Sequence, residues 1–352
     1  MSFKSVLLGL SVFALTACSQ SASSDTKTDA AKSKNSGVVN IYSSRHYDTD
    51  LRLYSDFTEQ TGIEVNRIEA KSNALIERLK TEGELSPADL LITVDAGVFW
   101  RAENEGVLQS ISSDVLDARI PSHLRHPDGL WYGLSKRARV LIYNKENGRP
   151  ENLEDYEDLA DPAYKGTVCM RSSGNIYNIS LLSSFIANGD ETSAQDWTKG
   201  MVENFARKPQ SNDSGQIEAV ASGECKVSLV NTYYLARYAR SEDAAKKAIF
   251  DSIGIIFPNQ DNRGTHVNIS GAAVTANAPN KDNAIKFIEY LTSESAQRYF
   301  ADGNNEYPVI DLGGTSSAVQ SLGTFKEDKL NVGELGSNQA KAIEVFDAAG
   351  WQ

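Results

Sequence analysis

The sequence predicts an α/β protein made of two α/β units. Strand-like and helix-like segments alternate after residue 37, and a second such series begins beyond residue 144. This alternation is typical of crossover connections and of a mainly parallel sheet. The length of 352 residues also suggests about two domains, at roughly 150 residues each.

The first unit shows the spacing of apolar residues that is typical of helices and also the spacing that is typical of strands. Residues 50–60 (DLRLYSDFTEQ) space their apolar residues as a helix does, and Gly62 follows. Residues 72–81 (SNALIERLKT) predict a helix with Ser72 as its cap and Gly83 after its end. The strands expected in this unit are residues 38–42 (VVNIY), 63–68 and 89–94 (DLLITV).

A different pattern follows at residues 130–144 (LWYGLSKRARVLIYN). Two extended runs flank Ser135-Lys136-Arg137, which predicts a segment that crosses between lobes rather than a single strand. The second unit follows it, and its late segments could belong to either lobe. Its expected strands are 167–170, 226–231, 253–257 and 267–276, and its expected helices are 176–187, 194–205, 214–222, 281–291, 293–300 and 338–348.

The N-terminus predicts export. Lys4 precedes a short apolar run, and Leu-Thr-Ala-Cys at residues 15–18 is similar to a bacterial lipobox, in which Cys18 becomes a lipidated first residue. A simple soluble signal with a chance cysteine is the alternative. Residues 18–37 have too few large apolar residues to fold, so they predict a flexible tether. We therefore expect a periplasmic or cell-surface protein held to the membrane by a lipid anchor only.

Two cysteines remain after Cys18, namely Cys169 and Cys225. In an exported protein they are compatible with one disulfide, although two separate buried thiols would also fit.

Charge and motif content exclude several function classes. The net charge of −12 argues against a nucleic-acid partner. The sequence has no phosphate-binding loop, nucleophile elbow or zinc-protease motif, and its four histidines are scattered. A hydrolase or transferase would need a nucleophile–base pair, and none is apparent. We therefore expect a protein that is not an enzyme.

Tyrosines gather at three predicted strand-to-helix junctions. Tyr47 follows the first strand, Tyr177 follows the strand at 167–170, and Tyr233 and Tyr234 follow the strand at 226–231. Each tyrosine alone fits ordinary packing, and Tyr238 fits a helix face. Because ligands in α/β folds bind beyond the carboxyl ends of the strands, the four hydroxyls could share one cleft.

A shared phenol site favours one class of ligand. Neutral phenols are weak ligands for soft metals, whereas a hard trivalent cation such as Fe(III) displaces their protons and binds phenolates. Three or four phenolates on one such ion leave a net charge of about 0 to −1, which a nearby guanidinium would offset. Arg137 or Arg45 could supply it.

Four stretches carry a family resemblance: VNIYSSRHYDTD (39–50), ADLLITVDAG (88–97), WYGLSKRARVLIYN (131–144) and VNTYYLARYA (230–239). They resemble the FutA/FbpA-type periplasmic ferric-iron-binding proteins of bacterial ABC importers, over nearly the whole chain from residue 38. The resemblance implies a class II periplasmic-binding-protein fold, with two α/β lobes joined by crossing strands and a ligand cleft between them. It places the N-terminal lobe at 38–136 and 265–310, and the C-terminal lobe at 137–264 and 311–352.

The resemblance also implies a ligand set. Tyr233 and Tyr234 match the tyrosine pair of the family, Tyr47 and Tyr177 match its all-tyrosine branch, and His46 matches a residue that binds the metal in some members. Another branch uses a carboxylate, for which Asp95 is the available candidate. Arg137, and by position Arg45, would lie behind the ligands.

The function implied is a monomeric binding protein that delivers Fe(III) to an ABC transporter permease. A binding protein of the same fold for thiamine, a polyamine, sulfate or a phosphonate is the alternative.

Overall fold

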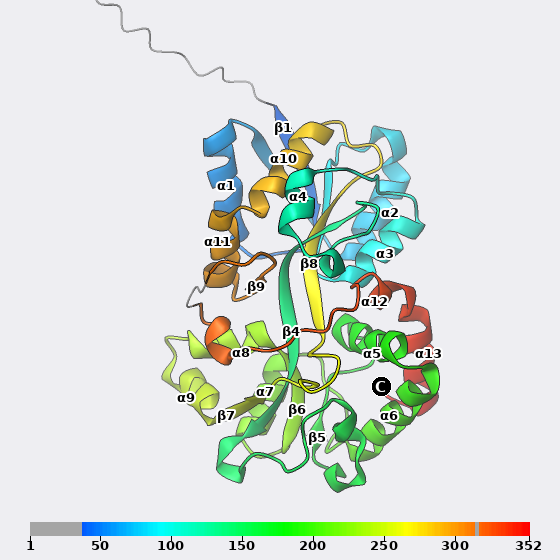
Figure 1. Ribbon diagram of the computed structural model, residues 1–352, viewed down its shortest axis with the longest axis vertical. Coiled ribbons are helices and arrows are strands. Elements are labelled where there is room, and N and C mark those ends of the chain that lie inside the picture. Colours follow the sequence, from blue (N-terminus) through cyan, green and yellow to red (C-terminus); the bar gives the residue numbers. More distant parts are fainter. Residues whose placement is uncertain (1–36, 314–316) are drawn as a thin grey trace, which may run out of the picture. The chain divides into compact units, whose positions relative to one another are not determined.

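Strand β4 (Tyr132–Asn144) runs through both halves of the sheet in the computed structural model (Figure 1). Its first half pairs with β8 (Val267–Val274) and β9 (Tyr307–Pro308), and its second half pairs with β6 (Val227–Asn231) and β7 (Ile253–Ile256). The structure describes residues 37–313 and 317–352. The predicted signal peptide, Cys18 and nearly all of the tether lie outside these residues.

The sheet order is β2-β1-β3-β8-β4-β6-β5, with β7 and β9 also paired to β4. We call the part around β1 the first lobe and the part around β6 the second lobe. The remaining strands are β1 (Val38–Ser43), β2 (Glu64–Glu69), β3 (Leu90–Thr93) and β5 (Val168–Cys169).

The longer helices are α1 (Asp50–Thr61), α2 (Ser72–Glu82), α3 (Ala96–Asn104), α5 (Ile176–Asn188), α6 (Glu191–Asn204), α7 (Asp213–Ala221), α8 (Thr232–Ala239), α9 (Ala244–Ser252), α10 (Lys281–Leu291), α11 (Glu294–Asn304) and α13 (Gln339–Ala349). Two short helices are α4 (Asp114–Arg119) and α12 (Glu334–Ser337).

The prediction of a mainly parallel sheet holds for the strands of the first unit, from which it was made, and does not hold for the sheet as a whole. β1 is parallel to β2 and β3, and β5 is parallel to β6, as strand–helix alternation requires. However, β8 is antiparallel to β3 and β4, and β4 is antiparallel to β6, β7 and β9. The reason is that β4 leads from the first lobe to the second and β8 leads back, so the two crossing strands must run in opposite directions.

The crossing segment is also one strand of 13 residues, not two runs separated by a polar break. The prediction failed because it treated Ser135 and Arg137 as breakers. Both side chains are buried, and each has a buried partner: Ser135 donates to Glu306 at 3.0 Å, and Arg137 donates to Asp95 at 3.3 Å. A paired polar side chain can remain inside a strand, since its burial is compensated.

Glycines end the first two helices as predicted, but the predicted cap of the second helix is not found. Gly62 closes α1 in the left-handed conformation, at a φ of 73°, and Gly83 closes α2 at a φ of 53°. The predicted cap at Ser72 is wrong, because Ser72 is the first helical residue and Lys71 holds the cap position.

The C-terminal segment lies against both lobes. Helix α12 contacts α3 on one side and α5 on the other (Figure 1). The contact with α3 is close: a Cβ added at Gly336 would lie 2.2 Å from Cβ of Trp100. The predicted lobe boundaries stay a prediction, and α12 shows that the tail contacts helices on both sides of the junction.

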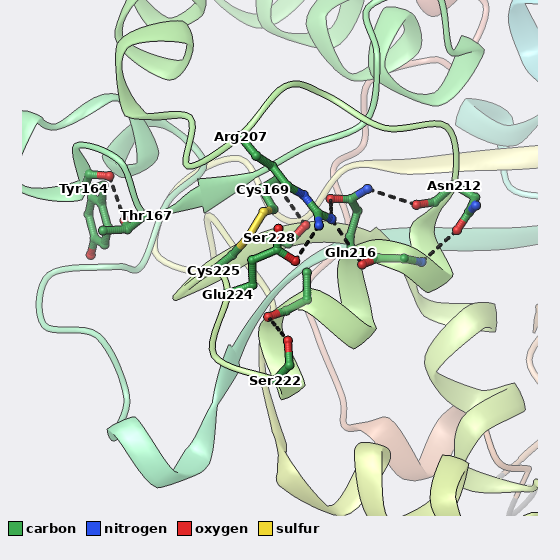
Figure 2. The surroundings of a disulfide bond; sticks show 12 residues. Tyr164, Thr167, Cys169, Arg207, Asn212, Gln216, Ser222, Glu224, Cys225 and Ser228 are labelled. Atoms are coloured by element: carbon green, nitrogen blue, oxygen red, sulfur yellow. Dashed lines mark hydrogen bonds and ion pairs between the residues drawn. A yellow bond between two sulfur atoms is a disulfide. The ribbon is translucent and has the colours of Figure 1, made fainter.

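A disulfide joins Cys169 of β5 to Cys225 in the loop before β6, with the Cα atoms 5.8 Å apart (Figure 2). Both residues are buried. Cys169 and Cys225 therefore form one disulfide and are not two separate buried thiols, the alternative that the sequence left open. The bond links residues 56 positions apart, and the hydroxyl of Ser228 reinforces it by donating to the Cys169 carbonyl at 2.7 Å. The disulfide and this hydrogen bond thus link the end of β5 to the start of β6 and to the loop before it.

Replacing both Cys169 and Cys225 with Ser should lower the free energy of unfolding by roughly 2–4 kcal/mol, because the unfolded chain regains the entropy of an open loop. Urea unfolding of the parent and the double variant measures the difference. Thiol titration of the denatured, unreduced parent should find neither cysteine free. Equal unfolding midpoints would contradict the stabilising role of the bond.

Candidate metal centre

The strand-to-helix junctions place each tyrosine. Tyr47 lies in the loop between β1 and α1, where its carbonyl accepts from the backbone N–H of Asp50 at 3.0 Å. Tyr177 is the second residue of α5, and the Asn175 side chain caps that helix by accepting from the Tyr177 backbone N–H at 3.1 Å. Tyr233 is in the first turn of α8, directly after β6. The side chains therefore start at the carboxyl ends of β1, β5 and β6.

Three of the four tyrosines lie together on the second lobe. The hydroxyl of Tyr233 donates to the hydroxyl of Tyr177 at 3.2 Å. The rings of Tyr233 and Tyr234 are 4.4 Å apart between centroids. Two phenols from α8 and one from α5 thus form a compact oxygen-rich cluster.

Arg237 connects this cluster to Tyr47 of the first lobe. Its guanidinium carbon lies 5.1 Å from the ring centre of Tyr233, 5.6 Å from that of Tyr234 and 5.5 Å from that of Tyr47. The structure therefore brings the four predicted tyrosines together. The guanidinium of Arg237 lies over three of their rings, and Tyr177 is hydrogen-bonded to one of these three, Tyr233.

Burial makes three of these phenols, those of Tyr47, Tyr177 and Tyr233, harder to ionise than a free tyrosine. It raises the pKa of Tyr233 well above its usual value, and the neighbouring phenols of Tyr177 and Tyr47 raise it further. Burial likewise raises the pKa of Tyr177, and it raises the pKa of Tyr47 to about 12. A ligand that binds these oxygens as phenolates must therefore supply enough positive charge to displace their protons.

Two predicted arginines lie behind the tyrosines. Arg45 is buried in ion pairs with Asp50 at 2.7 Å and Glu306 at 2.8 Å, and its guanidinium carbon is 4.6 Å from the ring centre of Tyr47. Arg137 is buried beside Asp95, and its guanidinium carbon is 5.2 Å from the ring centre of Tyr177.

The two arginines differ in how far their charges are satisfied. Arg45 is held by two carboxylates, whereas Nη1 of Arg137 has no hydrogen-bond partner among the described residues. The positive charge of Arg137 lowers the pKa of Tyr177, against the larger effect of burial. Arg137 is thus the better placed of the two to offset a phenolate.

Residues 86–328 match the family model for bacterial extracellular solute-binding proteins. The chain is 51% identical over 314 residues to iron uptake protein A1 of Synechocystis, covering 89% of this chain and 87% of the relative.

The chain belongs to the bacterial extracellular solute-binding protein family.

Solved structures agree with this assignment. Trichodesmium FutA (IdiA), solved with iron and citrate ligands, has a TM-score of 0.87 and 52% identity, covering 90% of this chain and all of that chain. Ferric iron-binding protein A of Mannheimia haemolytica, solved in an open conformation, has a TM-score of 0.83 and 39% identity, covering 90% of this chain and 99% of that chain. The predicted class II periplasmic-binding-protein fold is confirmed. The family consists of solute-binding proteins, which agrees with the expectation that the chain is not an enzyme.

His46 is exposed in this solute-binding protein, beside Tyr47. The ring centres of the two residues are 5.7 Å apart, and Nδ1 of His46 is 3.5 Å from the Ser44 carbonyl oxygen. Its role as a ligand stays a prediction.

Asp95, the carboxylate that the alternative branch would require, is fully buried. It accepts from the backbone N–H of Gly97, from Arg137 and from Asn268, at 2.9, 3.3 and 2.9 Å. These bonds engage Asp95 within the protein, so the tyrosines remain the better ligand set. Among residues 37–313 and 317–352, no group of three or more His, Cys, Asp or Glu side chains is placed to hold a metal.

Sequence reasoning missed a buried ionic cluster beneath the tyrosines. Asp213, the first residue of α7, forms ion pairs with Arg139 at 3.5 Å and Arg171 at 3.2 Å, and it accepts from the backbone N–H of Asn231 at 2.9 Å. The guanidinium of Arg171 also lies 5.3 Å from the ring centre of Tyr177. Asp213 thereby links the chain after β5 to the end of β6. These are the strands that precede Tyr177, Tyr233 and Tyr234 in the chain.

Of the residues that sequence reasoning missed, only Arg139 and Arg237 had a signal in the sequence. Arg139 follows Arg137 at the two-residue spacing of a strand, and Arg237 follows the tyrosine pair by one helical turn. Arg171 and Asp213 had no such signal, because only the fold brings them together.

Replacing Asp213 with Asn should lower the free energy of unfolding by about 3–5 kcal/mol, since two buried guanidinium groups lose their counter-charge. Chemical denaturation measures the effect. Asp251→Asn is a control that makes the same change in net charge at an exposed position of α9, and it should change stability by less than about 0.5 kcal/mol. Similar stability of the two variants would show that Asp213 is not needed to compensate Arg139 and Arg171.

Proposed function

We propose that this protein binds ferric iron outside the cytoplasm through Tyr47, Tyr177, Tyr233 and Tyr234, and delivers it to an ABC-type importer. The observation that carries the proposal is the convergence of four phenols from three strand-to-helix junctions. Arg237 lies over three of their rings, the Tyr177 hydroxyl is bonded to that of Tyr233, and Arg45 and Arg137 lie behind them.

The charges of the site favour a hard trivalent cation. The raised pKa values of Tyr47, Tyr177 and Tyr233 mean that a neutral solute would meet protonated phenols. Fe(III) displaces the protons and neutralises up to three phenolates, and the fourth negative charge faces the nearby guanidinium groups. The names of the relatives support this ligand: one is an iron uptake protein, and another was solved with iron.

Closure of the two lobes would complete the site. Tyr177, Tyr233 and Tyr234 belong to α5 and α8 of the second lobe, so they form the part of the site that first meets iron. Tyr47 belongs to the first lobe and adds its oxygen as the lobes close by a hinge motion. The open conformation named for the Mannheimia protein supports a hinge of this kind.

Delivery would occur at the membrane surface. Lipidation at Cys18 would hold the monomeric protein by a tether, and the closed form would dock on a permease. Among the described residues, no helix is long and apolar enough to cross a membrane.

Adding a ferric chelate such as ferric citrate to the metal-free protein should produce a visible absorption band from phenolate-to-iron charge transfer. Tyr234→Phe should weaken iron binding by more than the roughly 10–100-fold that loss of an outer-shell partner costs, and it should diminish the band. A competition titration against a chelator measures the affinity.

Tyr238→Phe is the matched control for this experiment. Tyr238 is on the same helix, but its hydroxyl donates to Glu218 at 2.7 Å, away from the cluster. The control should keep both the band and the affinity. The absence of any visible band in the parent would exclude the ferric phenolate site.

Acidification from about pH 7 to about pH 5 should release iron, since protons compete with the metal for phenolates. The direction follows from the raised pKa values: these phenols are protonated in the empty site, so iron binding releases protons, and a higher proton concentration drives that exchange backwards. Recording the visible band against pH in the presence of a chelator measures the release. Affinity that does not depend on pH would contradict phenolate ligation.

A further inference from the structure

The carboxylate of Asp95 meets groups from three parts of the molecule. It caps α3 of the first lobe by accepting from the Gly97 backbone N–H. It also accepts from Arg137 of β4 and Asn268 of β8, which lie directly opposite each other in the paired crossing strands. The fourth donor is Ser180 of α5 in the second lobe, whose hydroxyl lies 3.0 and 3.1 Å from the two carboxylate oxygens.

Of these contacts, the one from Ser180 depends on how the lobes are placed. Gly97 belongs to the same helix as Asp95. Asn268 ties that helix to the crossing strands a second time, because its Oδ1 accepts from the Ala96 backbone N–H at 3.1 Å. α3 is therefore anchored to the crossing strands without any help from α5. Rotation of the second lobe about those strands would separate Ser180 from Asp95.

The Ser180 contact is also coupled to the tyrosine cluster. Tyr177 and Ser180 are three residues apart on α5, so they lie on the same face of the helix. Arg137 lies over the Tyr177 ring at 5.2 Å, and it also pairs with Asp95, the carboxylate that Ser180 binds. The turn that presents Tyr177 is thus linked to α3 by the Ser180–Asp95 hydrogen bond and to β4 by the Arg137 guanidinium, in addition to the contacts that α12 makes with α3 and α5.

The chemistry of Ser180 supports a specific role. A buried serine inside a helix commonly donates to a carbonyl one turn earlier, as Ser184 does to Leu181. Ser180 donates to a buried carboxylate of the other lobe instead. Hydrogen bonds to charged groups are among the stronger ones in proteins.

We propose that the Ser180–Asp95 hydrogen bond is a latch that favours the closed form and so positions Tyr177 for the metal. The proposal rests on the proposed function, because closure serves to complete the iron site. Ser180 acts through the position of the lobes and of Tyr177, so it is a positioning residue and not a ligand. Opening the cleft to release iron requires this bond to break.

Ser180→Ala tests the latch, and Ser183→Ala is its matched control. Both serines are fully buried in α5, and the Ser183 hydroxyl has no hydrogen-bond partner among the described residues. Both changes favour the helix equally, since alanine has the best helix propensity. Similar thermal unfolding of the two variants would establish that both remain folded.

Two measurements then separate the latch from general stability. The rate at which a chelator removes iron should be about ten-fold higher for Ser180→Ala than for the parent, and within about two-fold of the parent for Ser183→Ala. The distance between labels at the exposed Leu85 of the first lobe and Lys246 of the second should shift toward longer values in Ser180→Ala. This distance is recorded with and without ferric iron.

The outcomes distinguish the latch from the iron site. If the parent shows no visible iron band, the proposed function fails, and the distance in the metal-free protein still tests the latch. A longer distance in Ser180→Ala than in Ser183→Ala supports the latch. Equal distances in both states, together with equal iron-release rates where iron binds, would overturn it.

Discussion

Buried positive charge is the constraint on which the site depends. Arg45, Arg137 and Arg139 are each almost completely inaccessible to solvent. A guanidinium at such a position requires a carboxylate beside it. The structure meets this requirement with carboxylates from other segments: Asp50 and Glu306 for Arg45, Asp95 for Arg137, and Asp213 for Arg139. These pairs fix the loops and helix ends from which the tyrosines project.

The same pairing explains how buried phenols can serve a trivalent ion. Low polarity around Tyr233 and Tyr177 raises their pKa values, so the empty site carries little phenolate charge. Arg237 and Arg137 provide positive charge close to the rings, with guanidinium carbons 5.1 Å from the Tyr233 ring centre and 5.2 Å from the Tyr177 ring centre. An ion of high charge can therefore ionise several phenols at once, whereas an ion of low charge cannot offset their mutual repulsion.

Position in the fold makes the site sensitive to lobe movement. Tyr47 comes from the first lobe and the other three tyrosines come from the second, so the proposed ligand set needs both lobes. The crossing strands β4 and β8 carry Arg137 and Asn268, which connect the junction to Asp95 and, through it, to α5. The disulfide between Cys169 and Cys225 fastens β5 to the chain entering β6 (Figure 2), which keeps the second-lobe half of the site together.

The sequence by itself determined the α/β class, most element positions and the four tyrosines, because hydrophobic periodicity and strand-to-helix junctions are local signals. It could not determine that β4 is a single strand antiparallel to its neighbours, or that Ser72 is not a helix cap. Only the tertiary structure decided the pairing of Cys169 with Cys225 and the partners of Arg139 and Asp213. The physical reason is that the role of a buried charge or thiol depends on its partner, and the partners of Cys169 and Arg139 lie 56 and 74 residues away in the chain.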